Sequence, residues 1–314
     1  MVEARRYAVL LLVLLLALFP VCRGRSRTQA QIQKAQEEPA SEAAGAEDHS
    51  VPEPPFCMNS GSDFASGEDD IFTPLFRDGL VLSCEDVAQL SFGIDPARLR
   101  AAKDRQLAVA KRYDELRRRF LKVRERLRRL PREEALAKVE QMLPYALAGV
   151  AFPPWLGTTW DFYGATDTPA RGEIACGYFI AATLYAVGFN VRISTIREGE
   201  RHFYLAGLAA AKVVEKVADP DSIKRFYNRP LSELEAEVRR QGEGVFVLGL
   251  DNHVAYIVYQ DGTGIWLWHS KPMHAVALER PKDARFVTQS RLRVIGKLGR
   301  HAAEVWLDGK RISR

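Results

Sequence analysis

The sequence predicts an α+β protein in which a helix carrying a single cysteine packs on an antiparallel sheet, preceded by a hairpin of two helices. Apolar residues recur every three or four positions in residues 94–150 and again after Cys176, which is typical of amphipathic helices. From residue 244 onward, short β-rich segments alternate with turns such as Asp261-Gly262, which is typical of antiparallel strands. The apolar content of 47% and the charged content of 27% are those of an ordinary globular protein.

The first 24 residues have the layout of a secretory signal peptide. Arg5 and Arg6 precede an unbroken apolar run over residues 7–19, and small residues follow up to Gly24. The run is short for a membrane span, so we expect export to the periplasm, envelope or exterior and cleavage after Gly24. Two alternatives stay open at this point: lipidation of Cys22, as in bacterial lipoproteins, and an uncleaved signal anchor.

The next two segments are predicted to be a tether and a small cap. Residues 25–55 are rich in Gln, Glu, Ala, Ser and Pro and have little to bury, which predicts disorder. Residues 56–93 carry two cysteines among Gly, Ser and Asp. In an exported protein Cys57 and Cys84 are expected to form a disulfide, which leaves Cys176 unpaired.

Residues 94–150 are predicted to be a basic helical hairpin. Asp95-Pro96 is a good helix start, and the apolar stripe that follows predicts one helix of about nine turns up to Leu130. Pro131 ends it, and a shorter helix folds back. The other face of the first helix is dense in arginine, and we interpret it as a solvated face. Contact of residues 96–130 with an anionic envelope is the alternative. The export signal argues against binding of nucleic acid. These arginines are Arg117, Arg118, Arg119, Arg124, Arg126, Arg128 and Arg129.

Residues 151–314 are predicted to be one catalytic domain. A segment rich in Trp, Pro and Gly leads into the cysteine helix, and residues 189–196 are expected to form a strand. An insertion of two helical pieces follows at 208–241, with breaks at Asp219-Pro220 and Arg229-Pro230. Further strands are expected at 244–250, 253–259, 264–270, 275–278, 292–298 and 304–307.

Cys176 is the candidate nucleophile. It opens the predicted helix after a glycine-marked turn, and the positive end of the helix dipole favours the thiolate, which is the reactive form. The alternative is an inert core cysteine, because Cys176 lies on the same stripe as Phe179, Ile180 and Val187.

His253 and His269 are the candidate partners of the thiol. They begin and end two strands joined by the Asp261-Gly262 turn. A three-residue loop would place both on one face of the sheet, and a two-residue loop would place them on opposite faces. A base that takes the thiol proton and a third group that orients the base are what thiol catalysis requires. The alternative for each is a buried, hydrogen-bonded histidine without a catalytic role.

Four further residues are candidates for the substrate cleft: Trp160, Tyr163, Glu173 and Gly177. The two aromatic residues suit a core position equally well, and Glu173 suits the helix N-terminus. We expect neither a metal site nor a cofactor. No His, Cys or Asp pair has helical metal-ligand spacing, and the glycine pairs at 242–244 and 262–264 lack the rest of a phosphate-binding motif.

These residues together resemble the NlpC/P60 branch of the papain-like cysteine peptidases. The likeness lies in Tyr163-Gly164, a proline and a glycine before Cys176, His253-Val254 opening a strand and His269-Ser270 closing the next, over residues 152–314. The resemblance implies a papain-like thiol hydrolase core that cuts peptide bonds in peptidoglycan stem peptides. It also implies that Cys176 is the nucleophile, His253 the general base and His269 the orienting residue.

Two departures from that family define the alternatives. Ala175 and Gly177 stand where the family has Asp and Ser, and 77 residues separate Cys176 from His253. A transglutaminase-like acyl transferase is similar in the end of the cysteine helix, Gly188 to Arg192, although its third residue is ordinarily Asp. A catalytically silent envelope protein of the same fold, which binds cell wall or a protein partner, is the alternative without chemistry.

Overall fold

The computed structural model describes residues 52–57, 72, 75, 79–93, 95–191, 193–196, 200–203 and 215–312, with backbone alone at 193–196 and 200–203. The predicted signal peptide, nearly all of the tether and most of the first helical piece of the insertion lie outside these residues. Residues Ser50–Arg314 form one compact unit, and the boundaries predicted at 93/94 and 150/151 both fall inside it.

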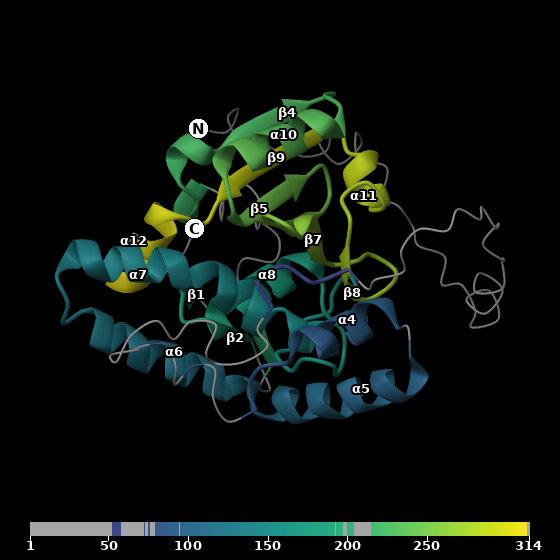
Figure 1. Ribbon diagram of the computed structural model, residues 1–314, viewed down its shortest axis with the longest axis horizontal. Helices are drawn as coiled ribbons and strands as arrows, with labels where there is room; N and C mark the ends of the chain where they lie inside the picture. The colour runs from purple at the N-terminus through teal and green to yellow at the C-terminus, as the bar shows by residue number, and fades with distance from the viewer. Residues whose placement is uncertain are drawn as a thin grey trace, which may run out of the picture. The chain divides into compact units, whose positions relative to one another are not determined.

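A six-stranded antiparallel sheet is the centre of this unit, so the fold is α+β as predicted (Figure 1). Its strand order is β4 (Lys224–Tyr227), β9 (Leu292–Lys297), β5 (Gly244–Leu250), β6 (Val254–Gln260), β7 (Gly264–Ser270) and β8 (Val276–Glu279). Five of these strands match predicted segments to within one residue at each end. Residues 261–263 form the turn between β6 and β7, as the Asp-Gly pair predicts.

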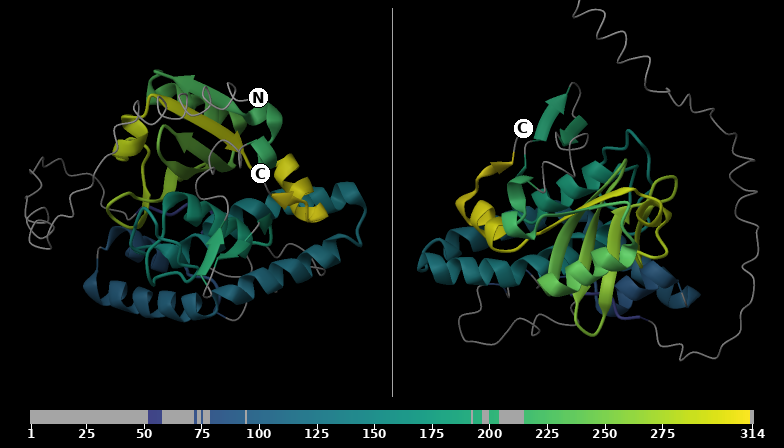
Figure 2. Two further views of the ribbon diagram at one scale, coloured as in Figure 1. Left: turned by 180° about the vertical axis from the view of Figure 1, so that it is seen from behind. Right: turned by 90° about the horizontal axis from the view of Figure 1, so that it is seen from above.

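The two faces of the sheet carry different cores. Tyr256, Trp266 and Trp268 face the cysteine helix α8 (Cys176–Ala186) and the N-terminal helices. Residues one position away on the same strands, such as Ile257 and Leu267, face α10 (Leu231–Gln241) and α11 (Arg285–Thr288). This alternation is the two-residue period of a strand buried on both sides. Figure 2 shows α8 and α10 on opposite sides of the sheet.

The predicted nine-turn helix is two helices. α5 (Pro96–Lys111) and α6 (Tyr113–Leu127) are separated at Arg112, whose backbone leaves helical geometry at φ −110° and ψ 10°. α7 (Arg132–Pro144) begins directly after Pro131, as predicted, and continues into a π-helical segment η2 (Tyr145–Ala151) and the 3₁₀ turn η3 (Pro153–Trp155). In Figure 1, α7 folds back from the end of α6.

The predicted disulfide is confirmed. Cys57 and Cys84 are bonded, with their Cα atoms 5.1 Å apart. Cys84 opens α4 (Cys84–Phe92), which is capped by Ser83 and Asp86 in a capping box. Phe56, on the other side of the bond, donates its backbone N–H to Gln260 on β6 at 2.6 Å. The disulfide therefore fastens the segment around Cys57 to α4, and the Phe56 hydrogen bond fastens it to the sheet.

The interpretation of the arginine face as solvated is wrong for the half-buried Arg117 and Arg124, whereas Arg128 is exposed although it also contacts a helix end. Arg117 donates to the carbonyl oxygens of Tyr185 (2.7 Å) and Phe189 (2.9 Å) at the end of α8. Arg124 donates to the Gly188 oxygen, and Arg128 donates to the Leu307 oxygen. Carbonyls at helix C-termini lack intrahelical donors, and these guanidinium groups supply them. Arg118, Arg126 and Arg129 are exposed.

Two further predictions are wrong. Residues 304–307 belong to a helix, α12 (Arg300–Asp308), not to a strand. The helix ends at Gly309, which has left-handed backbone geometry. In its first turn, the His301 backbone N–H donates to the Asp219 carboxylate at 2.6 Å. The insertion also contains the edge strand β4 besides its helix α10, which begins after Pro230 as predicted.

The strand predicted at 189–196 is present in two pieces that lie outside the main sheet. β1 (Asn190–Val191) pairs in parallel with β10 (Arg311–Ile312), and β2 (Ile193–Ile196) pairs with β3 (Glu200–Phe203).

Candidate active site

α8 begins at Cys176 because the chain before it is held in an extended conformation. Ile174 donates its backbone N–H to Thr159 (2.9 Å), and Ala175 donates to Gly164 (2.8 Å). Gly164 has no room for a side chain, since a Cβ there would lie 2.6 Å from the backbone carbon of Glu173. Gly164 therefore lets this strand approach closely enough to fix the start of the helix.

The backbone N–H groups of Cys176 and Gly177, in the first turn of α8, interact with the Cys176 sulfur. The N-cap of this helix is Ala175, whose side chain forms no capping hydrogen bond. The first N–H groups of a helix have no intrahelical acceptor, and the dipole makes this end positive. The N–H groups at Cys176 and Gly177 are consequently suited to stabilise an oxyanion that forms beside the sulfur.

The Cys176 sulfur lies where β6 and β7 separate. The pairing of these two strands ends at Tyr256 and Trp268. Beyond that point, the backbone N–H of Val254 interacts with the Cys176 sulfur, and Ser270 Oγ donates to the Ile174 oxygen at 2.6 Å. The start of α8 is thus fastened to the ends of both histidine-bearing strands.

The two histidines are in contact, and the connection between their strands has the three-residue length that places both on one face. The three-residue turn pairs Gln260 with Gly264, and this register puts His253 and His269 on the same face of the sheet. His253 Nε2 and His269 Nδ1 are 2.9 Å apart. Both side chains are buried, with residue exposures of 4% and 0%.

Glu279 on β8 extends this contact, and sequence reasoning missed it. Its Oε1 lies 2.9 Å from His269 Nε2, and Lys271 Nζ donates to its Oε2 at 2.7 Å. The register of β7 and β8 pairs Leu267 with Glu279, so His269 and Glu279 are diagonal neighbours on one face. The alternating pattern of residues 276–279 was the available signal, because it places Glu279 on the same face as Ala277 and opposite to Leu278.

The protonation of both rings follows from this chain of contacts. Hydrogen bonds from His269 and Lys271 outweigh burial and lower the pKa of Glu279 to about 2, so its carboxylate is ionised and accepts only. His269 must then donate through Nε2–H. Burial lowers the pKa of His269, so at neutral pH its ring is uncharged and Nδ1 accepts from His253 Nε2–H.

His253 Nδ1 is therefore the basic nitrogen of the pair. Burial, and the neighbouring His269, lower the pKa of His253 to about 3, so the ring is neutral and Nδ1 carries a lone pair. This nitrogen is buried, and it has no hydrogen-bond partner among the described residues. A buried, unpartnered acceptor is costly in a structural role, so it marks a site of interest.

The expectation that the helix end favours the thiolate is not met in the resting protein. Burial raises the pKa of the Cys176 thiol and outweighs the opposing backbone N–H groups of Val254 and Gly177. No hydrogen bond joins Cys176 to His253, although the sulfur interacts with the residue next to that histidine. The Cys176 thiol and the His253 imidazole are therefore both uncharged in the resting protein, and the His253 ring packs against Phe286 of α11, with the ring centres 5.5 Å apart.

The four cleft candidates have different surroundings. Tyr163 is 83% exposed, and Glu173 is also exposed. Gly177 is buried in the first turn of α8. Trp160 is half-buried, and its indole Nε1 is buried without a partner within the described chain. Of the four, Gly177 is the one whose backbone contacts the sulfur.

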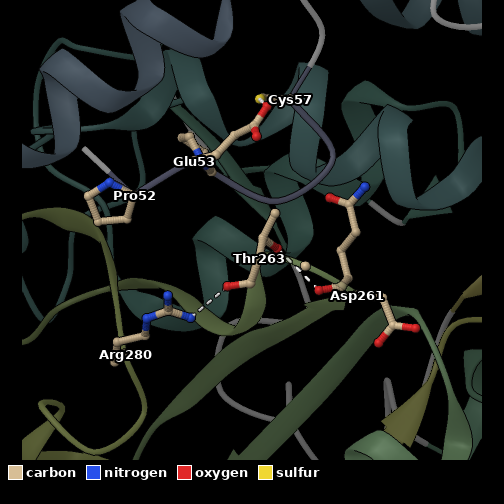
Figure 3. Close-up of a pocket in the computed structure, with 9 residues that line it drawn as sticks. Pro52, Glu53, Cys57, Asp261, Thr263 and Arg280 are labelled. Atoms are coloured by element: carbon tan, nitrogen blue, oxygen red, sulfur yellow. Dashed lines mark hydrogen bonds between the residues drawn. The ribbon is translucent and has the colours of Figure 1, made fainter. Parts of the chain in front are cut away.

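A pocket of about 400 Å³ lies elsewhere, between residues 52–57 and the β6–β7 turn (Figure 3). Arg280 borders it and donates to the Thr263 oxygen at 3.0 Å. Over the described ranges, three possible metal ligands converge only at Glu53, Cys57 and Cys84, and both of these sulfurs are in the disulfide. Among all the residues that the structure describes, no helix is long and apolar enough to cross a membrane.

Comparisons of this chain with models of known protein families, with curated proteins and with solved structures find no match.

Proposed function

We propose that the protein is an exported cysteine peptidase or amidase with a papain-like core, in which Cys176 is the nucleophile, His253 the general base and His269 the orienting residue. The observation that carries the proposal is the 2.9 Å contact between His253 and His269, which leaves the basic Nδ1 of His253 without a partner at the strand that borders the thiol.

The reaction is acyl transfer through a thioester. His253 Nδ1 takes the thiol proton as the Cys176 sulfur attacks the amide carbonyl, and the N–H groups at the start of α8 stabilise the oxyanion. The C–N bond then breaks, and His253 returns the proton to the leaving amine. Water attacks the thioester with His253 again as base, which releases the acid and restores the thiol. The steps need no cofactor or metal.

Peptide bonds of bacterial cell-wall stem peptides are the proposed substrate. The resemblance to NlpC/P60 peptidases supports this choice, and the signal-like N-terminus supports an envelope or extracellular location. The Cys57–Cys84 disulfide also supports export, since disulfides persist mainly in oxidising compartments. Lipid attachment at Cys22 and contact of the basic helices with an anionic envelope stay predicted alternatives.

Mass spectrometry of purified muropeptides incubated with the mature protein tests this function. We expect a stem-peptide product with a new free amine and carboxylate, and no product from Cys176→Ala. A product that contains an added amine instead of water would identify a transglutaminase-like acyl transferase. Absence of any product from correctly folded protein, across stem peptides of different composition, would overturn the peptidase proposal.

One observation favours the second candidate, a catalytically silent wall-binding protein. The Cys176 thiol is buried enough to raise its pKa, and no hydrogen bond connects it to His253. Cosedimentation with purified peptidoglycan, combined with the product assay, separates the two: a silent binder cosediments as the parent protein and yields no product from it, whereas a peptidase yields product from the parent protein.

A further inference from the structure

We infer that Glu279 is a positioning residue of the proposed active site, which selects the tautomers of both histidines and thereby makes His253 Nδ1 the basic nitrogen. This inference rests on the proposed function for its catalytic meaning, but the tautomers themselves can be measured without any substrate. Glu279 and Lys271 belong to neither the predicted triad nor the resemblance.

The geometry requires an acceptor at position 279. Two donors converge on the carboxylate, His269 Nε2 at 2.9 Å and Lys271 Nζ at 2.7 Å, and each binds its own oxygen. The lysine ammonium has three donors and no acceptor. Only a group with two acceptor atoms satisfies both neighbours at once while His269 keeps its proton on Nε2.

The effect of the carboxylate passes through two rings. If His269 carries its proton on Nε2, its Nδ1 accepts from His253 Nε2–H, and the lone pair of His253 is on Nδ1. If His269 instead carries its proton on Nδ1, that N–H donates to His253 Nε2, and the proton of His253 moves to Nδ1. In the second arrangement His253 Nδ1 carries a proton and is no longer a base. One carboxylate thus decides between an active and an inactive base.

Burial prevents water from replacing Glu279 as the hydrogen-bond partner of His269. The His269 side chain is 0% exposed and Glu279 is 16% exposed, so water does not readily replace a missing partner. Lys271 is 28% exposed and holds the second oxygen of Glu279, which fixes the carboxylate in place. The strands β6, β7 and β8 are neighbours in the sheet; His269 and Glu279 lie on β7 and β8, His253 directly precedes β6, and Lys271 directly follows β7.

Glu279→Gln is the decisive variant because it preserves shape and replaces one acceptor by a donor. Lys271 can bind only the amide oxygen, so the amide NH₂ faces His269 Nε2 and favours the inverted tautomers. The double variant Lys271→Met/Glu279→Gln removes the competing donor, which lets the amide oxygen turn to His269 and restore the original arrangement. Lys271→Met alone keeps the carboxylate and is the matched control.

The ¹⁵N shifts of the histidine ring nitrogens at neutral pH report the tautomers directly. We expect Nε2-protonated rings at His253 and His269 in the parent protein, in Lys271→Met and in the double variant, and Nδ1-protonated rings in Glu279→Gln. With a substrate in hand, kcat/KM should fall at least about 10-fold in Glu279→Gln and recover in the double variant. Loss through misfolding would appear as lost chemical-shift dispersion, which the double variant would share.

Unchanged ring tautomers in a folded Glu279→Gln protein would overturn the inference. Inverted tautomers without any peptidase activity in the parent protein would support the positioning role and count against the proposed function. Changed activity with unchanged tautomers would show that Glu279 acts through its charge alone, which also contradicts the inference.

Discussion

The two ends of α8 are built in opposite ways. At the C-terminal end, Arg117 and Arg124 donate to the last carbonyls, and Trp306 Nε1 donates to the Val187 oxygen at 2.7 Å. At the N-terminal end, no side chain caps the helix. The neighbour of Val254 in the sequence, His253, has an Nδ1 without a partner within the described residues, while the Val254 N–H interacts with the Cys176 sulfur.

This difference indicates that the C-terminal end of α8 serves stability and that its N-terminal end serves chemistry. Buried polar groups that have all their partners stabilise a fold, whereas unpartnered groups cost free energy and persist where a ligand or a reacting atom completes them. The arginine-rich end anchors the helix, so the thiol end can stay incomplete. Four variants or conditions test this contrast, from the largest expected effect to the smallest.

Cys176→Ala should abolish activity and leave stability nearly unchanged. Removal of a nucleophile costs about 10³-fold or more in rate. Cys176 is half-buried, and alanine removes only its sulfur atom, so we expect the free energy of unfolding to change by less than about 1 kcal/mol. Product formation and urea unfolding measure the two quantities. A strongly destabilised Cys176→Ala protein would show that this end of the helix is a structural contact.

Acid should destabilise the thiol end. The pKa of His253 is about 3 in the folded protein against an ordinary 6.5, so the unfolded chain binds the proton first. This contribution is complete above pH 6.5 and is lost as the pH falls toward 3, by about 5 kcal/mol at most. Glu279, with a folded pKa of about 2 against 4.5, adds a loss below pH 4.5.

Urea unfolding at pH 7.0 and pH 4.8 measures the His253 part before Glu279 contributes. We expect a smaller loss of stability over this interval in His253→Gln, whose side chain does not titrate. His269 stays in the variant and retains its own contribution of the same sign, because burial also lowers its pKa. Equal pH dependence in the two proteins would show that His253 is not held neutral.

Arg117→Ala should destabilise the protein by about 2–4 kcal/mol. The guanidinium makes two charged hydrogen bonds to the end of α8 and lies 3.8 Å from the centre of the Tyr185 ring. Arg118→Ala is the matched control, since this neighbour is exposed, and it should change stability by less than about 0.5 kcal/mol. Similar losses from both variants would contradict the anchoring role.

Gly188→Ala should cost about 1–2 kcal/mol. Gly188 closes α8 with a φ of 98°, where a side chain is strained, and a Cβ would lie 3.1 Å from Trp306 Nε1. Thermal unfolding checks this effect. Because the strain is at the anchored end, the rate of Cys176 acylation at a temperature well below unfolding should stay at the parent value.

Local patterns predicted the parts of the fold that local chemistry decides. The alternating strands and the Asp261-Gly262 turn predicted the hairpin that carries both histidines, while the shared face followed only from the register, which pairs Gln260 with Gly264. The cysteine spacing, together with the signal-like N-terminus, was sufficient for the disulfide. In each case the deciding information lies within a short stretch or in a single residue type.

The missed features depend on partners far away in the chain. Residues 304–307 have strand-like composition, but Ala302, Ala303 and Trp306 form a helical stripe, and Gly309 closes it. Arg117 looks like its exposed neighbours until the end of α8 is placed beside it. Glu279 gains its role from the register of β8 on β7, which no local pattern states.

The most direct test of the central claim is the rate at which Cys176 is acylated by a small activated ester, N-acetyl-alanine 4-nitrophenyl ester, followed at neutral pH by intact-protein mass spectrometry and nitrophenolate release. We expect a thioester to form on Cys176 in the parent protein, and to form at least about 100-fold more slowly in the His253→Ala variant. Equal acylation rates in the two proteins, or no acylation of the folded parent, would contradict the claim that His253 activates this thiol.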